Sequence, residues 1–233
     1  MQIWGVDKSK VRALCCLTLV LALALFSSMA RAAASEADAA GGIRAALARG
    51  AEAAISNLGK ADGFGGNPKV RIALPRYLAD AAKLLKATGQ GKRVEELELA
   101  MNHAAEQAMP HAKTLLVQTV KAISVQDAWK IVRGSDTSVT DFFAERTRSK
   151  LSEQFLPIIT KETEKVALAE KYNAVAGKAL ALGLVKGEDA NIQSYVTRRA
   201  LDGLYLMIGE EERKIRADPV ATGSAILKAV FGR

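Results

Sequence analysis

Residues 93–109, which read RVEELELAMNHAAEQAM, carry the clearest structural signal in the chain. Apolar and small side chains recur there at intervals of three and four, which is the period of one face of an α-helix. These residues are Leu97, Met101, Ala104, Ala105 and Ala108. Pro110 follows, and it predicts the end of this helix because proline lacks a backbone N–H. It also suits the first turn of the next helix, where that N–H is not needed.

Apolar and small residues recur with the period of an α-helix over nearly all of the chain after residue 36. The predicted helices cover residues 38–58, 77–88, 93–109, 110–123, 124–134, 137–166, 169–182, 190–216 and 219–231. Ser124 and Asp127 resemble a capping box at one helix start, and Asp189 is a candidate cap at another. We therefore expect an all-α, single-domain bundle of about eight helices.

Residues 61–76 interrupt the helical pattern. Asp62 to Pro68, DGFGGNP, is typical of turns, and Val70, Ile72 and Leu74 then alternate with less apolar residues as in a strand. The sequence predicts an extended Gly-rich loop with a short strand. A lone strand must pair with another strand, lie extended on the helices, or pair with another molecule, because its backbone needs hydrogen bonds.

The N-terminal 32 residues are typical of a cleavable signal peptide. Lys8, Lys10 and Arg12 precede an apolar run of 14 residues, which is shorter than the about 20 that a membrane-spanning helix needs. Ala30-Arg31-Ala32 fits the small-x-small cleavage pattern, so we expect a periplasmic chain of residues 33–233 with no transmembrane span. An uncleaved membrane anchor is the alternative. Both cysteines, Cys15 and Cys16, lie in the leader, so the mature chain would have none.

Positive charge is concentrated in one segment. The whole chain has a net charge of +8, and the mature chain a net charge of +5. Residues 60–93 alone have a net charge of +6, and their basic residues are Lys60, Lys69, Arg71, Arg76, Lys83, Lys86, Lys92 and Arg93. Such a patch would attract an anionic lipid or another envelope component. Nucleic acid is a less suitable partner, because few aromatic residues lie nearby to stack on bases. An ordinary solvated basic surface is the simpler interpretation.

Four polar residues are candidates for ligand binding. Asn102 and Glu106 lie one turn apart on a mostly apolar helix, and buried polar groups need partners. Arg71 is a candidate partner for both, and Asp202 lies beside Gly203 in another apolar helix. These residues would either anchor a ligand or form a structural bridge between elements.

The sequence offers little for catalysis or cofactors. It has two histidines, His103 and His111, and neither belongs to a His-Glu-x-x-His metal motif. There is no Gly-x-Ser-x-Gly elbow and no phosphate-binding loop. We therefore predict no catalytic residue, no metal site and no cofactor.

Three blocks of sequence stand out, Asp62–Pro75, Met101–Lys113 and Tyr195–Gly232, with Asp136–Phe143 as a shorter fourth block. Together they resemble the bacterial domain-of-unknown-function family numbered 4197. The resemblance covers about residues 42–232, although His103 stands where the family pattern favours arginine, and Gly209 is another departure. It implies an exported, mostly helical bacterial protein and supplies no activity.

These observations favour a non-catalytic periplasmic protein that binds an anionic amphiphile or a protein partner. A carboxylate-dependent hydrolase is one alternative, and it requires Glu106 and Asp202 to converge in one pocket. A structural or assembly factor is another, and it would act through an exposed strand at residues 70–74.

Overall fold

The computed structural model describes residues 40–75, 78–135, 138–183 and 191–218, and α-helices account for most of them. The first helix covers residues 40–58. The others are α2 (Ala79–Ala87), α3 (Gly91–Ala108), α4 (Ala112–Lys121), α5 (Val125–Arg133), α6 (Ser138–Thr163), α7 (Ala167–Ala181) and α8 (Ile192–Ala217), with the short 3₁₀ helix η2 (Met109–His111) between α3 and α4. The all-α prediction is confirmed. The predicted total of about eight helices concerns the whole chain and stays a prediction.

The predicted short strand does not form in the part of the chain that the structure describes. Residues 71–75 belong neither to a helix nor to a strand. Of the three arrangements open to such a segment, the chain adopts the one in which it lies against the helices. We call residues 61–75 the docked loop.

Local signals set several helix ends. The Ser124 hydroxyl accepts a hydrogen bond from the Asp127 N–H at 3.0 Å and caps α5, as the sequence predicts. Pro110 lies in η2, where α3 gives way to α4. The cap of α8 is Asn191, whose side chain accepts from the Ser194 N–H at 2.7 Å. Asp189, the leader and the predicted helix at 219–231 lie outside the described residues.

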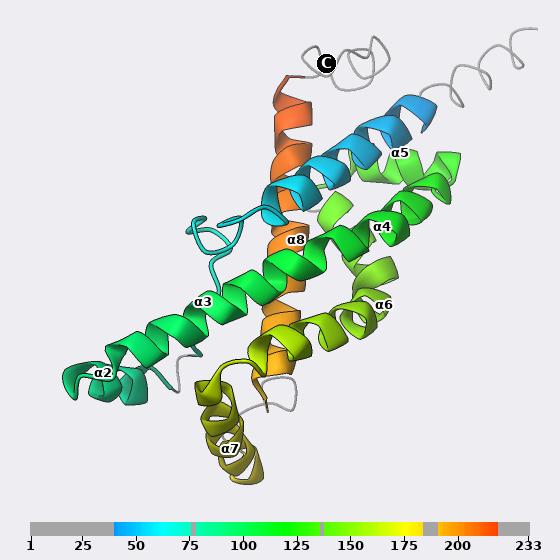
Figure 1. The fold of residues 1–233 in the computed structure, drawn as a ribbon. Helices are drawn as coiled ribbons and strands as arrows, with labels where there is room; N and C mark the ends of the chain where they lie inside the picture. The colour runs from blue at the N-terminus through cyan, green and yellow to red at the C-terminus, as the bar shows by residue number, and fades with distance from the viewer. Residues whose placement is uncertain (1–39, 76–77, 136–137, 184–190, 219–233) are drawn as a thin grey trace, which may run out of the picture.

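The centre of the molecule is formed where α3, α6 and α8 cross. In Figure 1, α3 and α6 pass across α8, and the helix of residues 40–58 crosses its upper part. The largest fully buried side chains include Phe143, Leu151 and Phe155 of α6 and Tyr205 of α8. Burial of each such side chain contributes about 1.5–3 kcal/mol, so this crossing supplies much of the stability.

The docked loop belongs to this core. Phe64 and Ile72 are fully buried, and Val70 is nearly so. A Cβ atom placed on Gly203 of α8 would lie 2.8 Å from Cε1 of Phe64 and 3.3 Å from Cβ of Val70. Glycine at 203 therefore permits the loop to pack directly on the α8 backbone.

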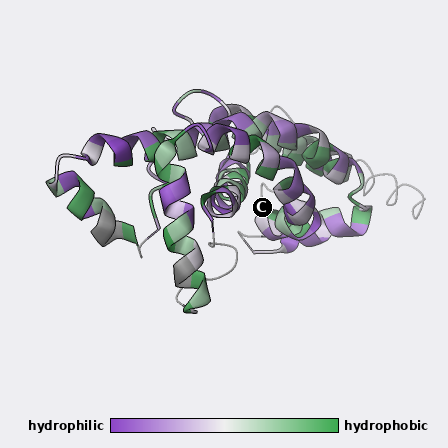
Figure 2. Cartoon of the chain, turned by 60° about the horizontal axis from the view of Figure 1, so that its bottom comes forward, coloured by the Kyte–Doolittle hydropathy of each residue, from purple (hydrophilic) through white to green (hydrophobic). Residues whose placement is uncertain are grey.

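Two helices, α2 and α7, extend away from the crossing of α3, α6 and α8 (Figures 1 and 2). Large apolar side chains are exposed on both helices, with Leu84 of α2 66% exposed and Val175 of α7 48% exposed. Figure 2 shows hydrophobic residues along α7 as it leaves the body of the protein. Each of these two helices therefore leaves part of its apolar surface exposed to solvent.

Candidate functional site

Asn102 fixes the docked loop to α3. Its Oδ1 accepts a hydrogen bond from the Ile72 N–H at 2.9 Å, and its Nδ2 donates to the Ile72 carbonyl at 2.8 Å. The same amide nitrogen donates to the Glu98 carbonyl of α3 at 2.7 Å. The side chain is 3% exposed. One amide thus bonds both backbone groups of Ile72, which is the role that a neighbouring strand would otherwise have.

Glu106 holds the first turn of the docked loop one helical turn away. Its Oε1 accepts hydrogen bonds from the Phe64 N–H at 3.0 Å and the Gly65 N–H at 3.3 Å. Its Oε2 lies 3.8 Å from Nδ1 of His103. The residue is 5% exposed, and two backbone donors offset part of the desolvation of its carboxylate. These contacts are those of a structural bridge between loop and helix.

The turn that reaches Glu106 requires unusual backbone geometry. Asp62 adopts a φ of +57°, in the left-handed region that aspartate tolerates better than most residues. A Cβ on Gly63 would come within 2.6 Å of the Asn57 carbonyl oxygen, so glycine is needed for this close approach. The Gly-rich motif therefore serves to fold the loop back onto α3.

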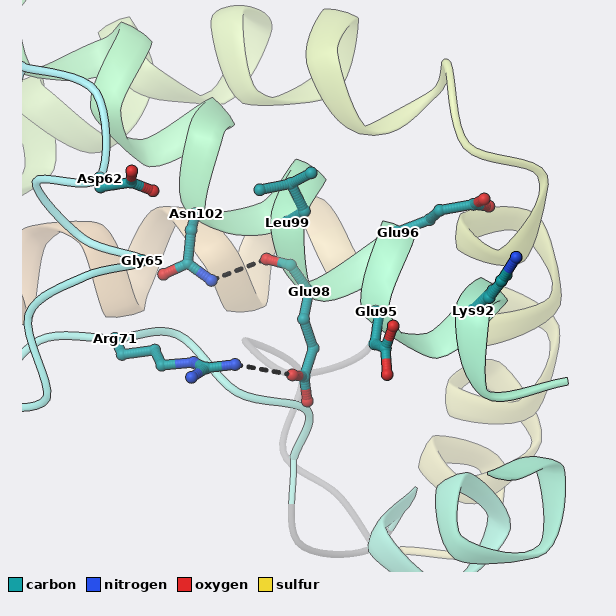
Figure 3. A pocket seen from close by; sticks show the side chains of 9 residues that line it. All are labelled: Asp62, Gly65, Arg71, Lys92, Glu95, Glu96, Glu98, Leu99 and Asn102. Carbon is teal, nitrogen blue, oxygen red and sulfur yellow. Dashed lines mark hydrogen bonds and ion pairs between the residues drawn. The ribbon is translucent and has the colours of Figure 1, made fainter. Parts of the chain in front are cut away.

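A hollow of about 540 Å³ lies where the docked loop meets the start of α3 (Figure 3). Its lining residues are Asp62, Gly65, Arg71, Lys92, Glu95, Glu96, Glu98, Leu99 and Asn102. Arg71 Nη2 lies 3.4 Å from Glu98 Oε2, as the dashed line in Figure 3 shows. Because four carboxylates face two cations, we call this the acidic hollow.

A second hollow of about 530 Å³ adjoins the acidic hollow and includes Glu106 and His103. Glu162 and Lys165 also line it, and their side chains form an ion pair at 2.7 Å. The hydrogen bond from Lys165 holds the pKa of Glu162 below its ordinary value. Arg71, Asn102 and Glu106, three of the four predicted site residues, thus surround two adjoining hollows.

Asp202, the fourth predicted site residue, lies apart from them between α6 and α8. Its Oδ1 is 2.9 Å from Arg148 Nη1, and its Oδ2 is 3.5 Å from Arg198 Nη1. It lines a different hollow, of about 460 Å³. Glu106 and Asp202 therefore do not converge, and the arrangement that a hydrolase using both would require is not present.

The predicted basic patch is divided in space. Lys69 forms an ion pair with Glu210 of α8 at 2.8 Å, and this contact lowers the pKa of Glu210. Arg71 is paired with Glu98, and Lys92 lines the acidic hollow. Arg76 lies outside the described residues. The other basic residues are Lys60, at the start of the loop, and Lys83, Lys86 and Arg93 at the α2–α3 end.

An apolar groove of about 160 Å³ lies between α2, α3 and α7, at the end of the molecule where α2 meets α3. Its lining residues are Leu74, Leu78, Ala82, Leu85, Gln90, Arg93, Val94, Leu97, Leu168, Lys171, Tyr172 and Val175. The sequence alone did not predict this groove. Leu78, Ala82 and Leu85 do recur with helical spacing, as do Leu168, Tyr172 and Val175, but such stripes predict burial without naming the partner.

Residues 33–232 match the model of a protein family that is described as "Protein of unknown function (DUF4197)". The chain belongs to this family. No curated protein and no solved structure matches the chain. Membership of this family therefore assigns neither an activity nor a ligand to the chain.

The sequence blocks that resemble DUF4197 proteins meet in space. Phe64 from the first block bonds to Glu106 from the second and packs against Gly203 from the third. The residues that resemble the DUF4197 family thus include those that hold the docked loop against α3 and α8. Arg148, beside Asp202, lies outside all four blocks.

Two further findings apply to the described residues of this DUF4197 protein. Over residues 40–75, 78–135, 138–183 and 191–218, no group of three or more metal-ligating side chains could hold a metal ion. Within these same ranges, no helix has the length and apolar character to cross a membrane.

Proposed function

We propose that residues 33–233 form an exported, non-catalytic binding protein whose apolar groove takes the alkyl chain of an anionic amphiphile. The observation that carries the proposal is the combination of apolar walls and cationic edge residues in one groove. Arg93 and Lys171 line it together with Leu85, Leu97 and Tyr172.

The size and exposure of the groove support a partly held alkyl chain. Its volume of about 160 Å³ is below the about 300–1,000 Å³ of pockets that enclose a drug-sized molecule. Val175 lines the groove and is 48% exposed, although large apolar side chains are usually buried. An alkyl chain lying along the groove would remove this apolar surface from water.

The charges near the groove favour an anionic head group. Arg93 stands at the start of α3 and donates a hydrogen bond to Gln90 at 3.1 Å, which leaves its positive charge uncompensated by that contact. Lys171 of α7 lines the same groove, and Lys86 lies exposed in the last turn of α2. An anionic head group beside these cations would gain electrostatic energy that a neutral head group would not.

Titration with detergents of one chain length tests the proposal on the purified chain that begins at Ala33. Dodecanoate is expected to bind more tightly than dodecyl maltoside, with an affinity that falls as salt is added. Isothermal titration below the critical micelle concentrations measures both.

Two variants separate the apolar from the charged contribution. Val175→Asp should abolish binding of both detergents, whereas Leu206→Asp, at a 37% exposed position outside the groove lining, should leave binding unchanged. Combined Arg93→Gln and Lys171→Gln should reduce dodecanoate affinity to that of the maltoside. Unchanged dodecanoate binding in Val175→Asp would refute the groove.

The exported location is part of the same proposal. It rests on the basic start, the apolar run of 14 residues and the Ala30-Arg31-Ala32 pattern, all in sequence. Mass spectrometry of the chain recovered from the periplasm should give a new N-terminus near Ala33. A full-length chain in the membrane fraction would instead support the uncleaved anchor.

The other functions considered have less support. An assembly factor that adds a strand to residues 70–74 would need unbonded backbone groups there. The N–H groups of Arg71 and Ile72 and the carbonyls of Ile72 and Ala73 are already bonded within the chain. A hydrolase would need carboxylates that act together, and Glu106 and Asp202 line different hollows.

A further inference from the structure

The C-terminal end of α7 leaves large apolar side chains in contact with solvent. Three of the exposed large apolar residues in the described part of the chain, Val175, Leu180 and Leu182, lie in the second half of α7 or directly after it. Leu182 is the most exposed of the three, at 74%, and Leu180 is 40% exposed. A group of such side chains on a protein surface is typical of a binding site for a partner or a membrane.

The other described helices do not cover this end of α7. The helix extends away from the crossing of α3, α6 and α8, and its C-terminal end lies apart from the other described helices (Figures 1 and 2). A Cβ atom placed on Gly177 or on Gly183 would meet no neighbouring atom within 4 Å among the described residues. A partner could therefore approach Leu182 without displacing any described element.

The spacing of residues places Leu182 on the side of α7 that lines the apolar groove. Lys171 and Val175 line this groove. Leu182 follows Val175 by seven residues, which is close to two helical turns and returns to the same side, whereas Leu180 falls on the opposite side. We call Lys171, Val175 and Leu182 the docking face. It continues the wall of the apolar groove toward the C-terminal end of α7.

The docking face adjoins positive charge. Arg93 and Lys171 both line the apolar groove, and none of its lining residues, all of which belong to the described part of the chain, is acidic. Glu170 lies in the first turn of α7, at the opposite end of the helix from Leu182. The surface that includes the docking face and the groove is thus both apolar and cationic.

These properties suit an anionic bilayer surface better than a second copy of the chain. Two copies joined through the docking face would bring their cations together, and like charges repel each other. At a bilayer surface, apolar side chains enter the region of the acyl chains, while the long stem of a lysine lets its ammonium group reach the phosphates. The 15 residues of α7 are fewer than the about 20 that cross a bilayer, so the helix would lie along its surface.

We propose that the docking face binds the surface of an anionic lipid bilayer and brings the apolar groove against its acyl chains. This inference rests on the proposed function and deepens it, because it names the bilayer as the source of the amphiphile. An alkyl chain can then pass from the bilayer into the groove without being exposed to water, which would be unfavourable.

Flotation with two kinds of vesicle tests the proposal on the purified chain that begins at Ala33. Vesicles of equal parts phosphatidylcholine and phosphatidylglycerol should bind the chain about 10-fold or more tightly than vesicles of phosphatidylcholine alone, because several cations lie near the docking face. Added salt should reduce this difference. Equal binding to both vesicles would overturn the anionic bilayer as the partner, and no binding to either would overturn the docking face.

Two leucine variants at the same end of α7 test which side of the helix binds. Leu182→Asp changes a side chain that is 74% exposed, so the chain should still fold, and it should weaken binding to the mixed vesicles about 10-fold or more. Leu180→Asp, on the opposite side, is the matched control and should weaken binding by no more than about 2-fold. Equal losses in the two variants would contradict the docking face.

A fluorescent label reports contact with the bilayer at a single position. Both cysteines of the sequence, Cys15 and Cys16, precede Ala33, so a single introduced cysteine can carry a nitrobenzoxadiazole group. The emission of labelled Leu182→Cys should shift to the blue when the mixed vesicles are added. Labelled Leu206→Cys, at a 37% exposed position on α8, should not shift. A shift at 206 without one at 182 would place the bilayer contact elsewhere and overturn the proposal.

Two further measurements separate this inference from the proposed function and from self-association. Leu182 is not among the residues that line the apolar groove, so Leu182→Asp should keep the dodecanoate affinity of the unaltered chain while it loses vesicle binding. Vesicle binding by a chain that does not bind dodecanoate would refute the groove and leave the docking face in place. Sedimentation velocity should show a monomer. A dimer that Leu182→Asp dissociates would assign this face to a second copy and overturn the proposal.

Discussion

The docked loop and the apolar groove contact neighbouring parts of α3, and they use charged and apolar residues in opposite ways. In the docked loop, polar side chains are buried and bonded to backbone, as Asn102 is to Ile72. In the apolar groove, apolar side chains such as Val175 remain exposed, and cations line the edge. Buried polar residues in an apolar helix can thus be wholly occupied in folding, while incomplete apolar burial marks the surface on which the proposed ligand would lie.

The largest expected effect is loss of the bonds that hold the docked loop. Glu106→Ala leaves the Phe64 and Gly65 N–H groups without their acceptor, and Asn102→Ala does the same to Ile72. Each variant should lose about 2–4 kcal/mol of unfolding free energy, as buried groups lose their partners. Urea unfolding followed by circular dichroism measures this. Glu52→Ala, at a 46% exposed carboxylate, is the control, and equal losses in both carboxylate variants would contradict the bridging role.

A second prediction concerns the close approach of the loop to α8. Gly203→Ala should destabilise the protein by about 1–3 kcal/mol, because the new methyl group would overlap Phe64. Gly177→Ala in α7 meets nothing within 4 Å and should stabilise the protein by about 0.5–1 kcal/mol. Thermal unfolding of both variants gives the comparison, and a stabilised Gly203→Ala would show that the loop is not packed as described.

A third prediction uses the buried ring of Tyr205, which lies in the crossing of α6 and α8. Burial raises the pKa of Tyr205 above its ordinary value. The folded state therefore holds this proton more tightly than the unfolded state, and the resulting stability is present below pH about 10 and is lost as pH rises through the folded-state pKa.

Tyr205→Phe removes that ionisation and should flatten the loss of stability that sets in above pH about 10. At pH 7 the same variant should lose about 1 kcal/mol, because the hydrogen bond to Thr147 is gone. Urea unfolding at several pH values measures both effects. An alkaline loss as steep in Tyr205→Phe as in the unaltered protein would assign it to other groups.

The smallest expected effect on the unfolding free energy comes from a substitution in α2, one of the helices beside the apolar groove. Leu84→Ser changes a side chain that is 66% exposed on α2, so the unfolding free energy should change by less than about 0.5 kcal/mol. Leu97→Ser, at a groove-lining residue of α3 that is only 1% exposed, should cost several times more. Urea unfolding of this pair shows whether the exposed apolar residues are dispensable for folding. A large loss in Leu84→Ser would place α2 in the core.

Much of the helical pattern follows from residues that are neighbours in sequence. The stripe from Leu97 to Ala108, the Ser124 cap and the break at Pro110 all act within one or two turns, and the structure agrees with each. The departure of residues 71–75 from the helical pattern was also predictable, but the partner of their backbone groups was not. A side-chain amide in place of a strand leaves no pattern in the sequence, because one asparagine suffices.

The pairing of the charged residues shows most clearly what could not be predicted from the sequence. The count of basic residues over 60–93 ended just before Glu95, Glu96 and Glu98, which share a hollow with Arg71 and Lys92. Lys69 is paired with Glu210, which is 141 residues away in sequence. Net charge along a chain therefore did not predict net charge on the surface.

Helix type, helix ends and the need to bond an extended loop come from local chemistry, since they depend on backbone hydrogen bonds and contacts within a few residues. The separation of Asp202 from Glu106, the division of the basic patch and the apolar groove come from the packing of distant helices. Packing decides these features because they depend on residues that are far apart in sequence. The bond from Phe64 to Glu106, for example, spans 42 residues, and only the folded chain brings such groups together.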